Sequence, residues 1–497
     1  MIFENIDKIK SNKTEKKFFI EKIQLINELI SKYCLKSKID YNKIIPDIEI
    51  SIKELKLIGI IKHEQQLENV KRVLENKEYN RLIRSLTFYS KNKKQTGYLL
   101  KNFYYNYRKK QQQINEENNN PKIVDLFCGA GGFSLGFLKE DYHVELANDI
   151  DRTAIETYKF NHPEISSDKV VCKDIISIVE NIDTFIKSDV DIIIGGPPCQ
   201  SFSSANQQRV IDDPRNILYK YFIKATEKIK PKFVLMENVR GMKKVASQVV
   251  DDFKKIGYDI VYKLYNSYDF SVPQNRTRLI YIGVERDFSL KQNITSEDII
   301  EELDKELNNK PKYVLKDALS YIKELECAKI KNITEEDCEI SGKKIDINIF
   351  RGLENEYLKL INDKQVSNFT FNHKARYQNE NNQKIYATLK QGSDSTCESI
   401  KEIMPYSHRN HIFKDKYFKL VDNLPSRTIT AHMKMDCHSH IHPSQIRSIT
   451  PREAARIQSF PDNYLFLGPY LNTYRQIGNA VPPLMGRTFA KILKKYL

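Results

Sequence analysis

Residues 122–137 read KIVDLFCGAGGFSLGF, an apolar run followed by a glycine-rich turn and a second, mostly apolar stretch. The short and nearly continuous run KIVDLF (122–127) predicts a buried strand, and the residues after the glycines predict a helix. Glycines allow the backbone to approach a ligand closely, and a helix start presents free N–H groups. By itself this unit fits NAD, FAD or S-adenosylmethionine, or a tight turn without a ligand.

Three further stretches have the same character as the first strand. DIIIGG (191–196), FVLMENV (233–239) and RLIYIGV (278–284) are short, apolar and bounded by Gly or Pro. Between them, RNILYKYFIKATEKI (215–229) repeats its apolar residues at helical spacing. Strands that alternate with helices predict an α/β fold with a parallel sheet and helices on both faces.

The chain divides into five parts by composition. Residues 1–110 have helical apolar spacing, and the polar segment 111–120, QQQINEENNN, is typical of a linker. The strand–helix alternation occupies 121–285, and the charged and irregular stretch 286–444 interrupts it. The last part, 445–497, contains regular elements again.

The C-terminal part carries clear helix signals. RSITPREAARIQSF (447–460) predicts a helix with Thr450 as N-cap and Pro451 at its first position. QIGNAVPPLMGRTFAKILKKYL, at the end of the chain, predicts a turn followed by an amphipathic helix.

Composition limits the class of protein. With 497 residues the chain is long enough for two to four domains, and its formal net charge of +15 favours nucleic acid as a partner. No apolar stretch is long enough for a membrane span, and the N-terminus is not a secretory signal. The eight cysteines form no CxxC pair, so we expect a reduced, intracellular protein without disulfides.

Histidines are frequent in the irregular stretch, but their spacing does not match a zinc site, so we expect no metal ion there. We expect these histidines to contact DNA or to have structural roles instead. They are His373, His408, His411, His432, His438, His440 and His442.

Cys199 stands out in GGPPCQSFS (195–203) because two prolines stiffen the chain before it, directly after a predicted strand. A thiol held rigidly at a strand end is placed for nucleophilic attack. The alternative is a buried and inert cysteine. The prolines before Cys199 and the polar Gln200 and Ser201 after it favour the nucleophile.

Glu237, in MENV (236–239), lies where a buried strand emerges, which is where ligands bind in open parallel sheets. A partly buried glutamate can act as an acid near neutral pH. Arg276 and Arg278, in VPQNRTRLI (272–280), alternate at strand spacing, so we expect them to share one face and to bind a phosphate or a base. An ordinary exposed glutamate and a solvated strand face are the alternatives.

Taken in order, the glycine-rich turn, PPCQS, ENV, QNRTR, RSITPREAARIQSFPD and QIGNAVPP closely resemble the motifs of the DNA cytosine-5 methyltransferase family. The resemblance covers about 121–284 and 445–497, and six ordered motifs make it highly specific. It implies a Rossmann-like, S-adenosylmethionine-dependent methyltransferase sheet with helices on both faces. It further implies a smaller, irregular target recognition domain over 286–444 and a mainly helical N-terminal extension.

The resemblance also implies a cofactor, S-adenosyl-L-methionine. The turn 127–132 would hold its methionine part, Asp149 its ribose, and Ile150 its adenine. The residues expected to contact the cofactor are Phe127, Gly129, Ala130, Gly131, Asp149, Ile150, Asp174, Ile175 and Asn479.

For the reaction, the resemblance implies that Cys199 attacks C6 of a cytosine flipped out of the duplex, which then takes a methyl group on C5. Glu237 would hydrogen-bond the base, and Arg276 and Arg278 would steady the pocket. Gln200, Ser203 and Arg215 belong to a loop that closes over DNA in this family. The usual glycines of that loop are replaced here by Ala205-Asn206-Gln207-Gln208, so the resemblance does not say how this loop hinges.

Several alternatives remain open. An RNA cytosine-5 methyltransferase would share the fold, a DNA-binding regulator would act through the N-terminal module, and a nicotinamide-dependent oxidoreductase would use the glycine-rich turn. The stretches 53–66 and 96–110 fit either a small DNA-binding module or a bundle that stabilises the catalytic domain.

As partners we expect double-stranded DNA and no membrane, with a cognate restriction endonuclease as a candidate. We further expect a monomer in the bacterial cytoplasm, associated with the nucleoid. The sequence does not reveal the DNA sequence that is recognised.

Overall fold

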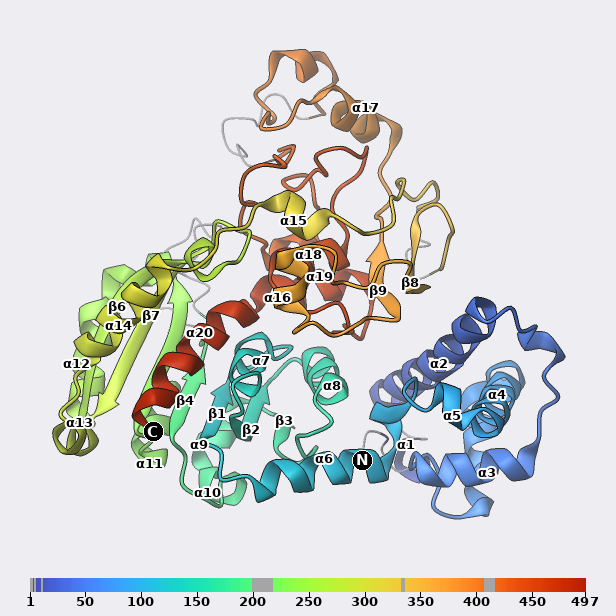
Figure 1. Ribbon diagram of the computed structural model, residues 1–497, viewed down its shortest axis with the longest axis horizontal. Helices are drawn as coiled ribbons and strands as arrows, with labels where there is room; N and C mark the ends of the chain where they lie inside the picture. Colours follow the sequence, from blue (N-terminus) through green and yellow to red (C-terminus); the bar gives the residue numbers. More distant parts are fainter. Residues whose placement is uncertain (1–2, 4–5, 10–11, 199–217, 332–335, 406–415) are drawn as a thin grey trace.

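The computed structural model describes residues 3, 6–9, 12–198, 218–331, 336–405 and 416–497. Figure 1 shows the N-terminal helices at one end of the molecule and a large sheet at the other, with a smaller, loop-rich part above them. Cys199, Gln200, Ser203, Arg215, His408 and His411 lie outside the described residues.

The large sheet has seven strands in the order β3-β2-β1-β4-β5-β7-β6. Strands β1 to β5 pair in parallel, whereas β7 runs antiparallel to both β5 and β6. The strands are β1 (Lys122–Leu126), β2 (His143–Asp149), β3 (Val170–Cys172), β4 (Ile192–Gly195), β5 (Phe233–Val239), β6 (Tyr258–Asn266) and β7 (Thr277–Glu285). The four strands predicted from apolar runs are therefore confirmed as β1, β4, β5 and β7.

Helices cover both faces of the sheet, so its central strands carry apolar side chains on both sides. Ile123 and Ile192 pack on one face, and Val124 and Ile193 on the other. The first face is covered by α7 (Gly132–Leu138), α8 (Arg152–Asn161), α13 (Arg286–Gln292), α14 (Ser296–Asn308) and α20 (Pro483–Leu493). The second is covered by α9 (Ile175–Glu180), α10 (Ile182–Phe185), α11 (Leu218–Ile229) and α12 (Ala246–Lys255). This confirms the predicted α/β, Rossmann-like fold.

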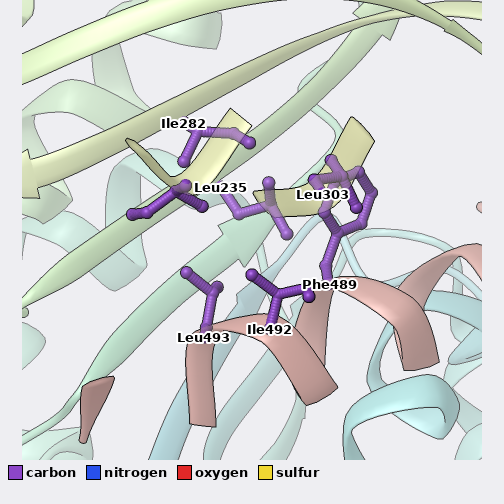
Figure 2. Close-up of a pocket in the computed structure, with 7 residues that line it drawn as sticks. Leu235, Ile282, Leu303, Phe489, Ile492 and Leu493 are labelled. Carbon is purple, nitrogen blue, oxygen red and sulfur yellow. The ribbon is translucent and has the colours of Figure 1, made fainter. Parts of the chain in front are cut away.

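The end of the chain returns to the sheet. Helix α18 (Pro451–Ile457) begins at Pro451 with Thr450 as its N-cap, as the sequence predicts, and is followed by α19 (Tyr470–Asn479). In Figure 2, Phe489, Ile492 and Leu493 of α20 face side chains of β5, β7 and α14 across a small gap lined by carbon alone. Helix α20 thereby completes the core beneath β5 and β7.

Helices α7 and α20 pack backbone to backbone at one point. A Cβ atom on Gly136 would lie 2.3 Å from the amide nitrogen of Arg487. Because no side chain fits there, this glycine permits the close packing that joins the C-terminal helix to the glycine-rich turn.

The segment predicted as a linker, 111–120, is mostly helical. Helix α6 (Tyr105–Glu117) continues through it and lies along the large domain (Figure 1). The Gln112 amide donates to the carbonyls of Pro163 and Ile165 at 3.3 and 3.4 Å. Polar side chains that look like a linker in sequence therefore dock this helix by hydrogen bonding, and the prediction of a linker was wrong for residues 111–117.

The rest of the N-terminal extension is helical, as predicted, with its own apolar core that also contacts Phe160 and Leu465. Within the basic aromatic stretch, Phe103 packs edge-on against Phe160, and the buried Arg108 donates to the carbonyl of Lys159 at 3.0 Å. These two side chains therefore dock the N-terminal extension onto the large domain. The helices are α1 (Ile6–Ile9), α2 (Lys13–Lys36), α3 (Ile48–Leu57), α4 (Leu67–Lys91) and α5 (Lys93–Thr96).

The predicted irregular stretch begins with regular structure. Ile299, Leu303 and Leu307 of α14 are buried in the core of the large domain, so the chain belongs to that domain up to Asn308. Beyond it, β8 (Gly342–Ile347) and β9 (Phe369–Lys374) form a small antiparallel sheet. The α-helices described in this smaller part are α15 (Leu315–Leu319), α16 (Glu356–Ile361) and α17 (Glu380–Thr388).

The histidines of this stretch that are described lie mostly inside it. His373, His440 and His442 are buried, and burial lowers the pKa of each to about 4. Among the described residues no group of His, Cys, Asp and Glu is arranged to hold a metal ion. No described helix has both the length and the apolar character needed to cross a membrane.

Candidate active site

The glycine-rich turn links β1 to α7 through left-handed backbone conformations. Phe127, Gly129 and Gly131 have φ angles of 60°, 54° and 85°. A Cβ atom on Gly131 would lie 2.7 Å from the ring of Tyr158, so only glycine fits. On Gly129, by contrast, a Cβ atom would meet nothing within 4 Å. The turn is therefore packed on one side and open on the other.

Asp149 ties the end of β2 to this turn. Its Oδ2 accepts the Gly129 N–H at 2.9 Å, and its Oδ1 accepts the Asp151 N–H at 2.7 Å. Burial raises the pKa of Asp149, and these backbone hydrogen bonds oppose that shift. The next side chain, Ile150, is 72% exposed, which is unusual for an isoleucine. An acceptor and an exposed apolar side chain thus stand together beside the turn.

Asp174 lies at the end of the neighbouring strand β3, where it caps α9. Its Oδ1 accepts the Ile176 N–H at 2.8 Å. The side chain of Ile175 is only 4% exposed and packs in the core, whereas that of Ile176 is 37% exposed. The structure therefore presents Ile176 at the surface and buries the side chain of Ile175, which the sequence had predicted as a contact.

Strand β4, between β1 and β5, leads into the proline-rich turn. The buried Asn238 amide donates to the Pro197 carbonyl at 3.1 Å, which fixes the turn two residues before Cys199. Cys199 itself, with Gln200, Ser203 and Arg215, lies outside the described residues. The described part of the turn therefore ends against β5.

Glu237 lies on β5 next to this turn. Its Oε1 is 2.8 Å from Nε of Arg278 on β7, and a Cβ atom on Gly196 would be 3.2 Å from its Oε2. The Arg278 contact is an ion pair by distance, but its N–H is not aligned for a hydrogen bond. The buried Oε1 consequently has no hydrogen-bond partner among the described residues. Glu237 thus offers an acceptor at the edge of the sheet.

Arg276 and Arg278 make different contacts, although we expected the two side chains to share one face of the strand. It is buried just before β7, and its Nη1 donates to the carbonyls of Ile429 and Gly478 at 2.8 and 3.1 Å. Burial lowers the pKa of Arg276 to about 9, and the charge of Arg278 adds to this effect. Arg276 therefore joins three distant segments, while Arg278 faces Glu237.

Gln274 belongs to the same joint and was given no role from the sequence. It is fully buried, its amide donates to Oε1 of Gln458 at 2.6 Å, and its carbonyl oxygen accepts the Ile429 N–H at 2.8 Å. Its place in the QNRTR motif was the one signal in the sequence that could have drawn attention to Gln274. Its role could not be predicted from that motif, because its partners are more than 150 residues away along the chain.

Asn479 is the last residue of α19 and is exposed. The chain after it returns to the glycine-rich turn, since a Cβ atom on Gly132 would lie 2.5 Å from the carbonyl oxygen of Val481. The two ends of the large domain therefore meet beside Asn479.

One buried acid near the turn was not singled out from the sequence. Asp125, on β1, is 1% exposed, and its Oδ2 has no hydrogen-bond partner among the described residues. Burial raises the pKa of Asp125 to about 7, the charge of Asp149 adds to the rise, and hydrogen bonding with Ser134 opposes it.

Comparison with known proteins shows the family to which the chain belongs. The model of the family described as C-5 cytosine-specific DNA methylase matches residues 121–495. The chain belongs to that family. It is a DNA cytosine-5 methyltransferase, as the order of its motifs predicted.

The proteins to which this methyltransferase is similar are also described as methyltransferases. It is 33% identical over 401 residues to the Type II methyltransferase M.DdeI of Desulfomicrobium norvegicum, a match that covers 75% of this chain and 88% of the relative. It is 30% identical over 432 residues to M.AgeI of Thalassovita gelatinovora, with 75% and 99% covered. Among solved structures, a protein described as a DNA modification methyltransferase encoded within a prophage (E. coli) is 27% identical, with a TM-score of 0.57 over 76% of this chain and 99% of that one.

Proposed function

We propose that this methyltransferase methylates carbon 5 of cytosine within one short sequence of double-stranded DNA, using S-adenosylmethionine and Cys199 as nucleophile. The observation that carries the proposal is the juxtaposition of Glu237, whose buried Oε1 has no hydrogen-bond partner among the described residues, and the start of the PPC turn at Gly196. In a member of the C-5 cytosine-specific family, that oxygen is an acceptor for the amino group of the target base.

The residues beside the glycine-rich turn fit the proposed cofactor. The open side of Gly129 leaves room for a ligand, and the exposed Ile150 offers an apolar surface for adenine. Each oxygen of Asp149 already accepts one N–H but retains a lone pair for a ribose hydroxyl. We assign the turn residues Phe127, Gly129, Ala130 and Gly131 to the methionine part. When bound, the cofactor supplies an electrophilic methyl group.

On the other side of the adenine ring we assign Asp174, Ile175 and Asn479 to the cofactor pocket. Because its side chain is buried, Ile175 acts through its backbone, and Ile176 supplies the apolar side chain.

The chain's own residues act on the base as follows. The Cys199 thiolate forms a bond to C6 of the flipped cytosine, and the ring's electron pair moves toward C5. Glu237 donates a proton to N3 and accepts a hydrogen bond from the amino group, which stabilises the charge that develops in the ring. After C5 has been methylated, a water molecule takes the C5 proton, the C6–S bond breaks so that Cys199 leaves as a thiolate, and N3 returns its proton to Glu237.

Arg278 holds the Glu237 carboxylate and is assigned to O2 of the base, whereas Arg276 is a positioning residue. Gln200, Ser203 and Arg215 are assigned to the loop that closes on DNA. We further propose that residues 309–444 read the target sequence, that the enzyme acts as a monomer on bacterial cytoplasmic DNA, and that a cognate restriction endonuclease accompanies it.

Transfer of labelled methyl groups from S-adenosylmethionine to unmethylated duplex DNA tests the proposal. The wild type should methylate one short motif, which bisulfite sequencing of the product identifies. Cys199→Ser should abolish transfer, and Cys397→Ser, which removes a half-exposed thiol of the smaller domain, should not. Transfer to tRNA but not to duplex DNA would overturn the proposed substrate, and full activity of Cys199→Ser would overturn the mechanism.

A further inference from the structure

A cleft of about 590 Å³ lies where the N-terminal helices meet the smaller domain. Its walls come from the start of α2, from Lys344 of β8, and from the loop before α19. The charged side chains that line it are Lys13, Lys16, Lys17, Lys344 and Glu21. The cleft is therefore strongly positive.

The only carboxylate among these lining residues is engaged through one oxygen, whereas Oε2 of Glu21 is buried without a hydrogen-bond partner among the described residues. Oε1 of Glu21 is 2.6 Å from Nζ of Lys344 and accepts the Gly468 N–H, also at 2.6 Å. In the part of the chain that the structure describes, Lys13, Lys16 and Lys17 have no carboxylate partner. Three ammonium groups are thus left for an anion from outside.

These lysines stand at an unfavourable end of their helix. They lie in the first turns of α2, where the helix dipole is positive, so each of them destabilises the helix start. Asn12 already accepts the N–H groups of Thr14 and Glu15, so the positive potential comes mainly from the side chains. A bound polyanion removes this repulsion.

The cleft adjoins the cofactor end of the candidate active site. Gly468 packs so closely on α8 that a Cβ atom on it would lie 2.2 Å from Cγ2 of Thr153. Glu15 of α2 forms a 2.9 Å ion pair with Arg152, at the start of the same helix. Asp149 and Ile150 immediately precede this helix, so α2 is anchored beside them.

We propose that this lysine-lined cleft binds the phosphodiester backbone of the substrate duplex outside the methylated sequence. Lysines are compact point charges that contact phosphates without reading bases, and a duplex longer than one helical turn carries phosphates well beyond the target. Residues 1–120 lie outside the family match, so this contact is an addition to the shared catalytic unit. The inference goes beyond the proposed function and rests only on duplex DNA as the substrate.

The test replaces Lys13, Lys16 and Lys17 together by Glu. Because glutamate suits a helix start, the triple variant should be at least as stable as the wild type, which thermal unfolding checks. The matched control replaces Lys71, Arg72 and Lys77 of α4 by Glu. These cations are exposed, belong to the same domain, give the same change in charge, and do not line the cleft.

Equilibrium binding is measured with a target duplex of about one helical turn (~10.5 base pairs) and with one of about four turns. Lys13→Glu/Lys16→Glu/Lys17→Glu should weaken binding of the long duplex about tenfold or more and reduce its salt slope by about 3, since each phosphate contact contributes about 0.9. Binding of the short duplex should stay within about twofold, and the control variant should resemble the wild type.

An unchanged salt slope on the long duplex, or equal losses on both lengths, would overturn the proposal. So would a loss of tRNA binding with unchanged duplex binding, which would make the cleft an RNA site. If the wild type binds the long duplex but transfers no methyl group, the proposed function fails, while the same titration still decides the role of the cleft.

Discussion

Nε of Arg278 lies 2.8 Å from Oε1 of Glu237, across the antiparallel pairing of β7 and β5. The pair is mostly buried at the edge of the sheet where the proline-rich turn begins, and the unaligned geometry leaves Oε1 without a hydrogen bond among the described residues. Arg278 therefore holds the carboxylate in place by charge, and Oε1 of Glu237 remains able to accept a hydrogen bond.

Glu237→Gln tests the assigned acid. The amide keeps the shape of the side chain but loses the ionisable proton, so methyl transfer should fall by about 10²-fold or more, the usual contribution of a general acid. Cofactor binding should be unchanged, because Glu237 is assigned to the base. Single-turnover transfer and cofactor titration measure the two effects, and a loss of less than about threefold in transfer would contradict the assignment.

Arg276→Met tests the joint between distant segments. The change leaves the buried carbonyls of Ile429 and Gly478 without their charged donor, so the free energy of unfolding should fall by about 3 kcal/mol or more. Arg278→Met, at a partly exposed position, should cost less. Urea unfolding compares the two variants, and equal or reversed costs would show that Arg276 is not the joint.

The exposed Ile150 and the buried Ile175 test the adenine side of the pocket. Ile150→Ala should weaken binding of S-adenosylmethionine by about tenfold, because the side chain buries apolar area only when adenine covers it. The melting temperature of the Ile150→Ala variant should hardly change. Ile175→Ala removes a core side chain instead and should lower the free energy of unfolding by about 2–5 kcal/mol. Calorimetric titration and thermal unfolding together separate the two roles.

Asp125 should make stability depend on pH. Burial raises its pKa to about 7 in the folded protein, above the value near 3.9 of an unfolded chain. The folded protein therefore holds this proton more tightly, and the resulting stability is fully present below about pH 4 and is lost as pH rises through about 7.

Asp125→Asn should remove this loss, so its melting temperature should fall less than that of the wild type between about pH 5 and pH 8. The difference corresponds to at most about 4 kcal/mol. The exposed Asp251→Asn serves as the control. Parallel pH profiles for wild type and Asp125→Asn would contradict the assigned cause.

The strands that the sequence predicts are those buried on both faces. KIVDLF and DIIIGG are continuous apolar runs because β1 and β4 lie at the centre of the sheet. Strands β2, β3 and β6 were not predicted. Polar residues such as His143 and Glu145 interrupt the apolar residues of β2, β3 has only three residues, and β6 lies at the sheet edge with Lys263 exposed. Charged residues of α14 likewise concealed its apolar face, so the large domain extends further than predicted.

Single local motifs were enough to predict that Glu237 and Asp149 stand near the ends of strands, and the structure places them there. The roles of Arg276 and Arg278 could not be separated in this way. Their spacing is that of one strand face, but the burial of Arg276 comes from Ile429 and Gly478, which the local sequence does not reveal. The side-chain placement of Ile175 and Ile176 depends equally on how α9 packs on the sheet.

The most direct test of the central claim is covalent trapping on a target duplex that carries 5-fluorocytosine at the methylated position. Fluorine cannot leave C5 as a proton does, so the C6–S bond cannot break after methyl transfer. With S-adenosylmethionine present, the wild type and Cys397→Ser should form a complex with DNA that survives denaturing electrophoresis, and Cys199→Ser should form none. A stable complex with Cys199→Ser, or none with a wild type that methylates the ordinary duplex, would contradict Cys199 as the nucleophile.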